Sequence, residues 1–259
     1  MDSSLYANPS LYDAQYATLT RDGVFYAARA RKVDGPVLEL AAGTGRISEA
    51  ILEAGASLVG IERSRPMIAI ARRRLARFGG RGRFVQADFR RFALGRTFAL
   101  AVCGFNSLSH AAPAEFAAAL ARIRVHVKEG GALVFDLPNP GPRNPGPFLR
   151  ERFFDERVGE ACEVWETLEA ESDPRLWERV WEYRWASGRR ARETMRRWEY
   201  SEREVRAALA AAGFRVDALA GDFTGGAFGG ASLRQVWKVS PVGAAVNPEI
   251  GHAIAREAA

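Results

Sequence analysis

The chain has 259 residues, of which 47% are apolar and 26% charged, and its formal net charge is +6. A chain of this length and composition can bury one sizeable α/β core, so we predict a single domain spanning 1–259. It contains no run of about 18 apolar residues, and its first residues lack the basic and then apolar layout of a secretory signal, so we expect a cytoplasmic protein without a membrane partner. The two cysteines and three histidines predict neither a disulfide framework nor a metal site.

The positive charge comes almost wholly from arginine, because lysine occurs only at positions 32, 128 and 238. The arginines are scattered, with small clusters at 72–74 and 189–197, and elsewhere they alternate with glutamate. This pattern is typical of a solvated helix face and a hairpin edge rather than of one basic stripe. A nucleic-acid partner is therefore disfavoured, although an RNA acceptor stays open as an alternative.

In the first half of the chain, short apolar runs alternate with longer amphipathic stretches. This alternation is typical of a parallel sheet with helices on both faces. The expected strands are 36–40, 57–61, 83–86, 98–103 and 132–137, and the expected helices are 46–54, 65–78 and 113–127. Gly55 follows the first helix as a C-terminal glycine, and Ser64 precedes Pro66 as an N-cap would.

The proline-rich stretch 138–147 cannot continue a helix or a central strand, so it must be a connecting loop. Beyond it the sequence alternates at period two, with turn residues at 186–189, which predicts an antiparallel insert over 148–200. Ser201 and Glu204 form a capping box for a helix over 201–212. Strands 214–220 and 233–239 would complete the core, and 241–259 would be a C-terminal tail.

A glycine loop follows the first predicted strand in the stretch VLELAAGTGR, 37–46. A dinucleotide fingerprint needs a third glycine three residues after Gly45, but Ser48 occupies that position. Glu39 at the strand end would repel a pyrophosphate, whereas it suits a ligand that carries an ammonium and a sulfonium. An NAD(P) site is therefore disfavoured.

Two further acids fall at the ends of successive strands. Glu62 ends the second strand, where a carboxylate can accept hydrogen bonds from both ribose hydroxyls. Asp88 follows the third strand, where it can accept from an adenine amino group while Phe89 lies against the ring. Each acid alone is equally well explained as a cap or a surface charge. Their placement at three successive strand ends is what favours a ligand site.

These motifs resemble those of the class I S-adenosylmethionine-dependent methyltransferases. The resemblance rests on ELAAGTGR (39–46), GIERS (60–64), QADF (86–89) and LAVCGFNSLSH (100–110), and it covers about residues 5–240 in order. It implies a Rossmann-like α/β fold with a seven-stranded, mostly parallel sheet, helices on both faces and a small antiparallel β lid inserted after strand 5. It also implies an N-terminal lid segment over 1–30.

Within this superfamily the chain is similar to small-molecule enzymes that methylate sugar amines or heterocycles. The cofactor implied is S-adenosylmethionine, and Glu62 stands where the family usually has aspartate. Carried over by position, its binding residues would be Tyr16, Glu39, Ala41, Gly43, Gly45, Arg46, Glu62, Arg63, Met67, Asp88, Phe89, Gly104, Phe105 and Asn106.

The acceptor site is expected between the N-terminal tyrosines, the end of the fourth strand and the insert. Its candidate residues are Tyr6, Tyr12, Asn106, Ser109, His110, Phe148 and Trp185. His110 is the candidate catalytic base, although a lone histidine at a helix start is more often a cap. The tyrosines can equally belong to an amphipathic helix packed on the core.

The expected activity is methyl transfer to a nitrogen or oxygen of a small, planar heteroaromatic metabolite in specialised biosynthesis, by in-line displacement. Catalysis would come mainly from positioning and exclusion of water. No metal is expected, because 104–106 carry no carboxylates for magnesium. The alternatives are an RNA or nucleobase methyltransferase and a non-catalytic cofactor-binding regulator. We expect a monomer or a homodimer.

Overall fold

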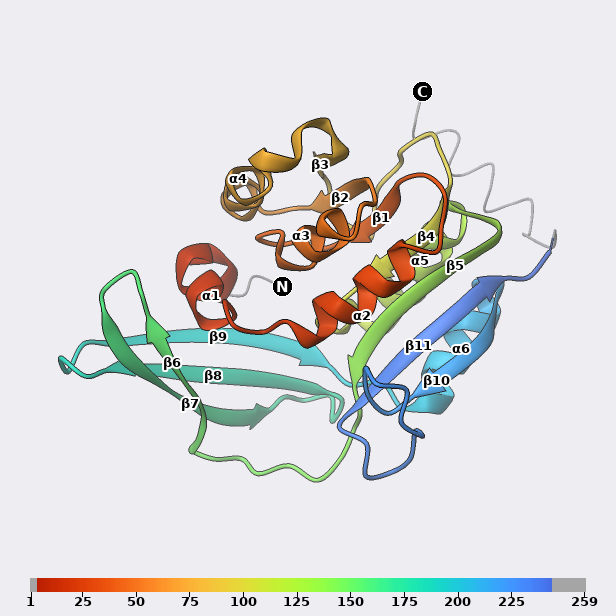
Figure 1. Ribbon diagram of the computed structural model, residues 1–259. Coiled ribbons are helices and arrows are strands. Elements are labelled where there is room, and N and C mark those ends of the chain that lie inside the picture. Colours follow the sequence, from red (N-terminus) through yellow and green to blue (C-terminus); the bar gives the residue numbers. More distant parts are fainter. Residues whose placement is uncertain (1–3, 244–259) are drawn as a thin grey trace.

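The computed structural model describes residues 4–243, which form a central seven-stranded sheet and a separate four-stranded sheet (Figure 1). The central strands are β1 (Val37–Leu40), β2 (Leu58–Glu62), β3 (Gly82–Gln86), β4 (Phe98–Cys103), β5 (Val127–Pro138), β10 (Phe214–Ala220) and β11 (Arg234–Pro241). Their order is β10-β11-β5-β4-β1-β2-β3. Strands β1 to β5 pair in parallel, and β11 runs antiparallel to both β5 and β10. This topology confirms the expected Rossmann-like sheet with an antiparallel last strand.

Helices cover both faces of the central sheet (Figure 1). The helices of the described residues are α1 (Pro9–Gln15), which packs on the insert, α2 (Arg21–Ala30), α3 (Arg46–Glu53), α4 (Arg65–Arg74), α5 (Pro113–Arg124) and α6 (Glu202–Ala211). There are also 3-10 helices at Ser4–Ala7, Ala76–Arg81 and Ser107–His110. Tyr26 and Ile51 bring α2 and α3 onto one face, while Phe116 and Leu209 bring α5 and α6 onto the other. Strand β1 is buried at every position, because a central parallel strand is covered on both sides.

The four-stranded sheet is the insert between β5 and α6. Its strands are β6 (Phe148–Asp155), β7 (Glu160–Ala170), β8 (Leu176–Trp185) and β9 (Arg190–Trp198), antiparallel in that order. Leu11 of α1 packs into its apolar face with Val164, Trp181 and Tyr183. Helix α1 thus lies between the insert and α4 (Figure 1).

Several predicted boundaries were wrong. The helix expected over 113–127 ends at Arg124, because 127–138 form one long strand in which Gly130 takes a φ of 75°. The helix expected over 65–78 ends at Arg74 and is followed by a 3-10 helix containing Gly79 at a φ of 59°. The strands β6 and β7 were not separated by the sequence pattern. Helix α1, which carries Tyr12, agrees with the amphipathic helix considered for the N-terminal tyrosines, although no bounds were predicted for α1 or α2.

The helix caps form as the sequence predicted. The side chain of Ser64 accepts a hydrogen bond from the Met67 amide, and Ser201 and Glu204 form the capping box at the start of α6. Cys103 and Cys162 are free and buried. Most of the predicted tail 241–259 lies outside the described residues. Within residues 4–243, no helix is long and apolar enough to span a membrane.

Candidate active site

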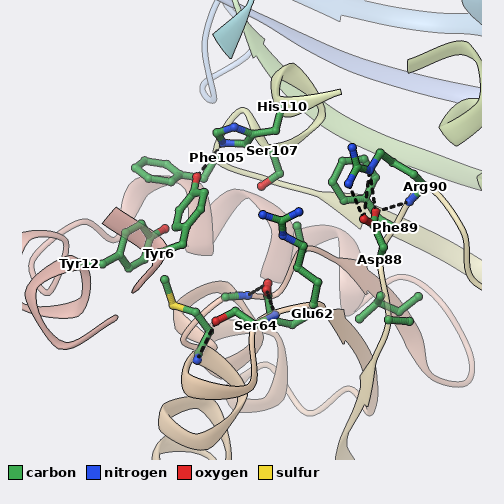
Figure 2. A pocket seen from close by; sticks show the side chains of 16 residues that line it. Tyr6, Tyr12, Glu62, Ser64, Asp88, Phe89, Arg90, Phe105, Ser107 and His110 are labelled. Carbon is green, nitrogen blue, oxygen red and sulfur yellow. Dashed lines mark hydrogen bonds and ion pairs between the residues drawn. The ribbon is translucent and has the colours of Figure 1, made fainter. Parts of the chain in front are cut away.

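The carboxyl ends of the parallel strands open into a cleft (Figure 2). Ligands of open α/β sheets bind at this edge. The cleft is lined by Tyr6, Tyr12, Ala41, Gly43, Ile61, Glu62, Arg63, Ser64, Met67, Ala87, Asp88, Phe89, Arg90, Phe105, Ser107 and His110. An adjoining smaller pocket shares Tyr12, Ala41, Gly43, Phe105 and Ser107, and adds Glu39, Ala42, Thr44, Arg46, Ile47 and Gly104.

The glycine loop connects β1 to α3 and separates these two spaces. Ala41, Gly43 and Gly45 all have positive φ, at 52°, 59° and 83°. Glu39 at the end of β1 is only 2% exposed, and the hydroxyl of Ser48 donates to its carboxylate at 2.5 Å. Burial raises the pKa of Glu39 to about 8. The serine that replaces a third glycine therefore fixes the orientation of a buried acid.

Glu62 at the end of β2 holds the glycine loop against the next strand. Its carboxylate accepts from the Gly43 amide at 2.9 Å and from the Ser64 amide at 2.8 Å, through different oxygens. Burial raises the pKa of Glu62, and these amides offset only part of that effect. The Arg63 amide acts on the same carboxylate, which leaves about one of its four acceptor positions for a further donor.

Asp88 lies beyond β3 and is paired within its own turn. Both of its oxygens accept from the guanidinium of Arg90 (Figure 2). Arg90 also pairs with Glu115 at 2.7 Å. Burial raises the pKa of Asp88, but the bonds from Arg90 outweigh this and leave it lowered. Phe89 lies next to this pair in the cleft wall. Asp88 is therefore ionised and already neutralised by a neighbour.

The loop after β4 is shaped by Asp136 from the neighbouring strand β5. This fully buried carboxylate accepts from the amides of Phe105 and Asn106, at 2.8 and 3.1 Å, and from the hydroxyl of Tyr26 at 2.7 Å. Phe105 and Asn106 have positive φ, at 57° and 59°, which is uncommon for residues other than glycine. Asp136 thus stabilises a strained backbone that presents Phe105 to both pockets.

Tyr6 and His110 meet at the opposite wall of the cleft (Figure 2). The tyrosine hydroxyl lies 2.6 Å from Nε2 of His110, while Nδ1 lies 3.2 Å from the carbonyl of Arg196. Because a carbonyl only accepts, the hydrogen is assigned to Nδ1, and Nε2 accepts from Tyr6. Burial lowers the pKa of His110 to about 3, so the ring is neutral at physiological pH.

The N-terminal tyrosines form a row across the cleft, in which each ring makes an edge-to-face contact with the next. Tyr6 packs on Tyr12, Tyr12 on Tyr16 and Tyr16 on Phe105, with ring centroids 6.0, 4.9 and 4.8 Å apart. Gln15 fixes α1 to the insert by hydrogen bonds to Glu151 and Tyr183, at 2.6 and 2.7 Å. The N-terminal segment therefore covers the cleft from the side of the insert.

Most of the residues predicted for the cofactor line one of the two spaces. Ala41, Gly43, Glu62, Arg63, Met67, Asp88, Phe89 and Phe105 line the cleft, and Glu39, Arg46 and Gly104 line the smaller pocket. Three lie behind this lining. Tyr16 packs against Phe105, Gly45 caps α3, and Asn106 caps the 3-10 helix Ser107–His110.

Only some of the residues predicted to bind the acceptor line the cleft. Tyr6, Tyr12 and His110 line the cleft. Ser109 is fully buried and donates to the Asn106 carbonyl, and Trp185 donates to Asp155 inside the insert. Phe148 begins β6, where it lies opposite Glu166 of the neighbouring strand β7, and it lines neither pocket. Trp185 turns away from the cleft because its ring packs into the apolar face that receives α1.

Other lining residues were missed by the sequence reasoning. They are Ile61, Ser64, Ala87, Arg90 and Ser107 in the cleft, and Ala42, Thr44 and Ile47 in the smaller pocket. Arg90 was detectable, since an arginine two residues after an aspartate can close on it locally. Ser107 was not, because nothing in the run 106–110 indicates the 3-10 turn that points Ser107 rather than Ser109 into the cleft.

Comparison with known proteins identifies the fold. Residues 37–131 match a family described as a methyltransferase domain. The chain resembles the structure of the CcbJ methyltransferase from Streptomyces caelestis (TM-score 0.76, 20% identity, 85% of this chain and 90% of that one). It also resembles CalS10, an amino pentose methyltransferase from Micromonospora echinaspora (0.69, 25%, 90% and 97%), and the sugar N-methyltransferase KedS8 from Streptoalloteichus sp (0.67, 26%, 87% and 91%).

Two curated relatives match over part of their length. A dTDP-3-amino-3,6-dideoxy-alpha-D-glucopyranose N,N-dimethyltransferase of Streptomyces fradiae is 37% identical over 101 residues, which are 39% of this chain and 38% of that protein. The cypemycin N-terminal methyltransferase of a Streptomyces species is 34% identical over 119 residues, 45% and 48% of the two chains. The match thus spans less than half of each relative.

The chain has the Rossmann-like fold of these methyltransferases, with a cleft at the ends of its parallel strands. Residues 37–131 match the methyltransferase-domain family, and the chain is similar to solved sugar-amine N-methyltransferases.

Replacement of Asp136 by alanine is expected to lower the free energy of unfolding by about 3 kcal/mol or more. The substitution leaves three buried donors without an acceptor, each at a cost of about 1–3 kcal/mol. Urea denaturation measures this loss. Asp34→Ala, at an exposed position, should change stability by no more than about 0.5 kcal/mol. A loss below about 1 kcal/mol for Asp136→Ala would show that the loop does not depend on this carboxylate.

Proposed function

We propose that this chain transfers a methyl group from S-adenosylmethionine to an amine nitrogen of a small molecule, in the biosynthesis of a specialised metabolite. The observation that carries the proposal is the cleft itself, in which buried acids face one end and a neutral tyrosine–histidine pair faces the other. Its relatives named as amino-sugar and peptide N-methyltransferases support a nitrogen acceptor.

The smaller pocket suits the amino-acid end of the cofactor. Glu39 is buried there and forms no ion pair within residues 4–243, so its carboxylate can pair with an ammonium. Arg46 is held by Asp22 through both terminal nitrogens at 2.6 Å, while its buried Nε has no hydrogen-bond partner. That free donor can bind a carboxylate. The pocket thus has one group for each charge of an amino acid.

The larger cleft suits the adenosine end. Glu62 keeps an acceptor position for a ribose hydroxyl, and Met67 and Phe89 supply apolar surface for a purine. Asp88 is engaged by Arg90, so its proposed contact with the adenine amino group would use the remaining lone pairs. The sulfonium of S-adenosylmethionine supplies an electrophilic methyl group, and Gly43, which lines both pockets, lets the backbone approach the ligand closely.

The tyrosine–histidine pair would orient the acceptor rather than deprotonate it. Tyr6 donates a hydrogen bond to His110 and stays neutral, so its oxygen can accept an N–H bond and direct the nitrogen lone pair toward the methyl group. With a pKa of about 3, His110 is a poor base at neutral pH. A neutral amine needs no base, because it attacks with its own lone pair and the product ammonium releases its proton to water.

The relatives favour an amino sugar or a peptide amine over a planar ring. No tryptophan of the insert lines the cleft, and Trp181 and Trp185 are buried in the insert's own core. The heteroaromatic acceptor expected from these rings therefore has no support. The oligomeric state stays a prediction.

A methyl-transfer assay tests this function. Purified protein would be incubated with methyl-labelled S-adenosylmethionine and one of four acceptors: a dTDP-3-amino sugar, a peptide with a free N-terminus, a catechol or bulk RNA. We expect label in an amine acceptor only. Label in RNA, label in the catechol alone, or no label in any acceptor would contradict the proposal.

Binding of S-adenosylhomocysteine at pH 7 is expected to release close to one proton. Glu39, with a pKa of about 8, is mostly protonated when free and would ionise against the ligand's ammonium. Calorimetry in buffers of different ionisation enthalpy measures the release. Glu39→Gln should abolish it and weaken binding by about tenfold or more. Glu53→Gln, an exposed change on α3, should behave as wild type. If Glu39→Gln released as many protons as wild type on binding S-adenosylhomocysteine, Glu39 would not be the group that ionises.

Tyr6→Phe and His110→Ala are each expected to lower kcat by about tenfold, with affinity for S-adenosylhomocysteine within about threefold of wild type. The double variant should lose no more than either single one, because both changes remove the same oriented hydroxyl. The pH profile of His110→Ala between 6 and 9 should keep the wild-type shape, since His110 stays neutral throughout. A loss of about 100-fold in His110→Ala alone, with a changed profile, would instead assign a base.

A further inference from the structure

The inward face of the insert carries an arginine without an acidic partner. Arg197 on β9 is only 8% exposed, and its Nε is buried without a hydrogen-bond acceptor. No carboxylate of residues 4–243 forms an ion pair with it. Burying a guanidinium costs several kcal/mol, and unpaired examples are rare in folded proteins.

Arg197 lies beside the Tyr6–His110 pair. The residue before it, Arg196, supplies the carbonyl that faces Nδ1 of His110, and the sulfur of Met195 lies 3.6 Å from the hydroxyl of Tyr6. Side chains two apart on a strand share a face, so Arg197 points to the same side as Met195. Burial lowers the pKa of His110, and Arg197 is the charged group that adds most to this effect.

The acids in this region are already engaged. Glu166 on β7 pairs with Arg150 at 2.7 Å and also with Arg179, which stands on β8 opposite Met195. Glu193 accepts a bond from Asn8 at 3.4 Å, four residues along β9 from Arg197 and thus about 13 Å away. These acids therefore do not neutralise Arg197.

A guanidinium without an acidic partner can bind an oxyanion, because its planar fork of N–H groups matches a carboxylate or a phosphate. We propose that Arg197 binds an oxyanionic group of the methyl acceptor, so that the substrate is an amine that also carries a carboxylate or a phosphate. The inference rests on the proposed function, since the amine would lie at Tyr6 and His110 while the anion reaches past them to the insert. The insert then selects acceptors by charge, and its arginine is a specificity-determining residue.

Anion binding tests the subsite without turnover. The melting temperature of the protein would be measured against increasing sodium phosphate or sodium acetate at constant ionic strength in chloride, with and without S-adenosylhomocysteine. We expect a saturable rise for wild type. Arg197→Gln should weaken the apparent phosphate affinity at least fivefold, and Arg192→Gln, on the outward face of the same strand, should leave it unchanged. Arg197→Lys should retain part of it.

Melting in chloride alone separates binding from a structural role. Arg197→Gln should melt within about 2 °C of wild type or above it, because the substitution removes an unpaired buried charge. A fall of more than about 5 °C would make Arg197 structural and overturn the proposal, as would equal anion binding in wild type and Arg197→Gln. No saturable response in wild type would also overturn it.

Matched acceptors distinguish the two sources of the anion. A dTDP-amino sugar would be compared with the free amino sugar, and a peptide or amino acid with its carboxamide. One of the two pairs will contain the kind of anion that the enzyme recognises. In that pair, Arg197→Gln should raise the KM for the charged acceptor at least tenfold and change the KM for the uncharged acceptor by no more than about twofold. Equal effects on both members would overturn the proposal. Calorimetric binding of S-adenosylhomocysteine to all variants tests the proposed function separately, since Arg197 takes no part in it.

Discussion

The cleft depends above all on one buried carboxylate. Asp136 ties Tyr26 of α2 to the backbone of Phe105 and Asn106, and so joins the N-terminal segment, the end of β4 and the end of β5 at one point. The left-handed backbone that it stabilises places Phe105 against Tyr16 and leads into the 3-10 helix that carries His110. A rigid junction of this kind holds the side chains of Phe105 and His110 in position.

The parts of the site that the sequence predicted are those set by local rules. Glu39, Glu62 and Asp88 could be placed because the carboxyl ends of parallel strands share one edge, so position along the chain translates directly into position in space. Ser64 and Ser201 could be assigned because a cap bonds within its own first turn. The family resemblance then supplied the cofactor and the antiparallel last strand.

The remainder depends on contacts between distant segments, which one sequence does not encode locally. Whether Trp185 faces the cleft or α1 depends on the twist and register of the insert, and a shift of one residue reverses every side chain. The pairing of Tyr6 with His110 joins residues 104 positions apart. The role proposed for Arg197 depends on the lack of an acidic partner among the described residues, which only the folded structure reveals. Helix α1 escaped assignment because its seven residues form a helix mainly through packing against the insert.

The most direct test of this account is a calorimetric titration of the purified protein with S-adenosylhomocysteine, run beside an identical titration with NADPH. The buried Glu39 and the free acceptor position of Glu62 predict micromolar binding of S-adenosylhomocysteine and no measurable binding of NADPH. Preferential binding of NADPH, or no binding of either ligand, would contradict the account.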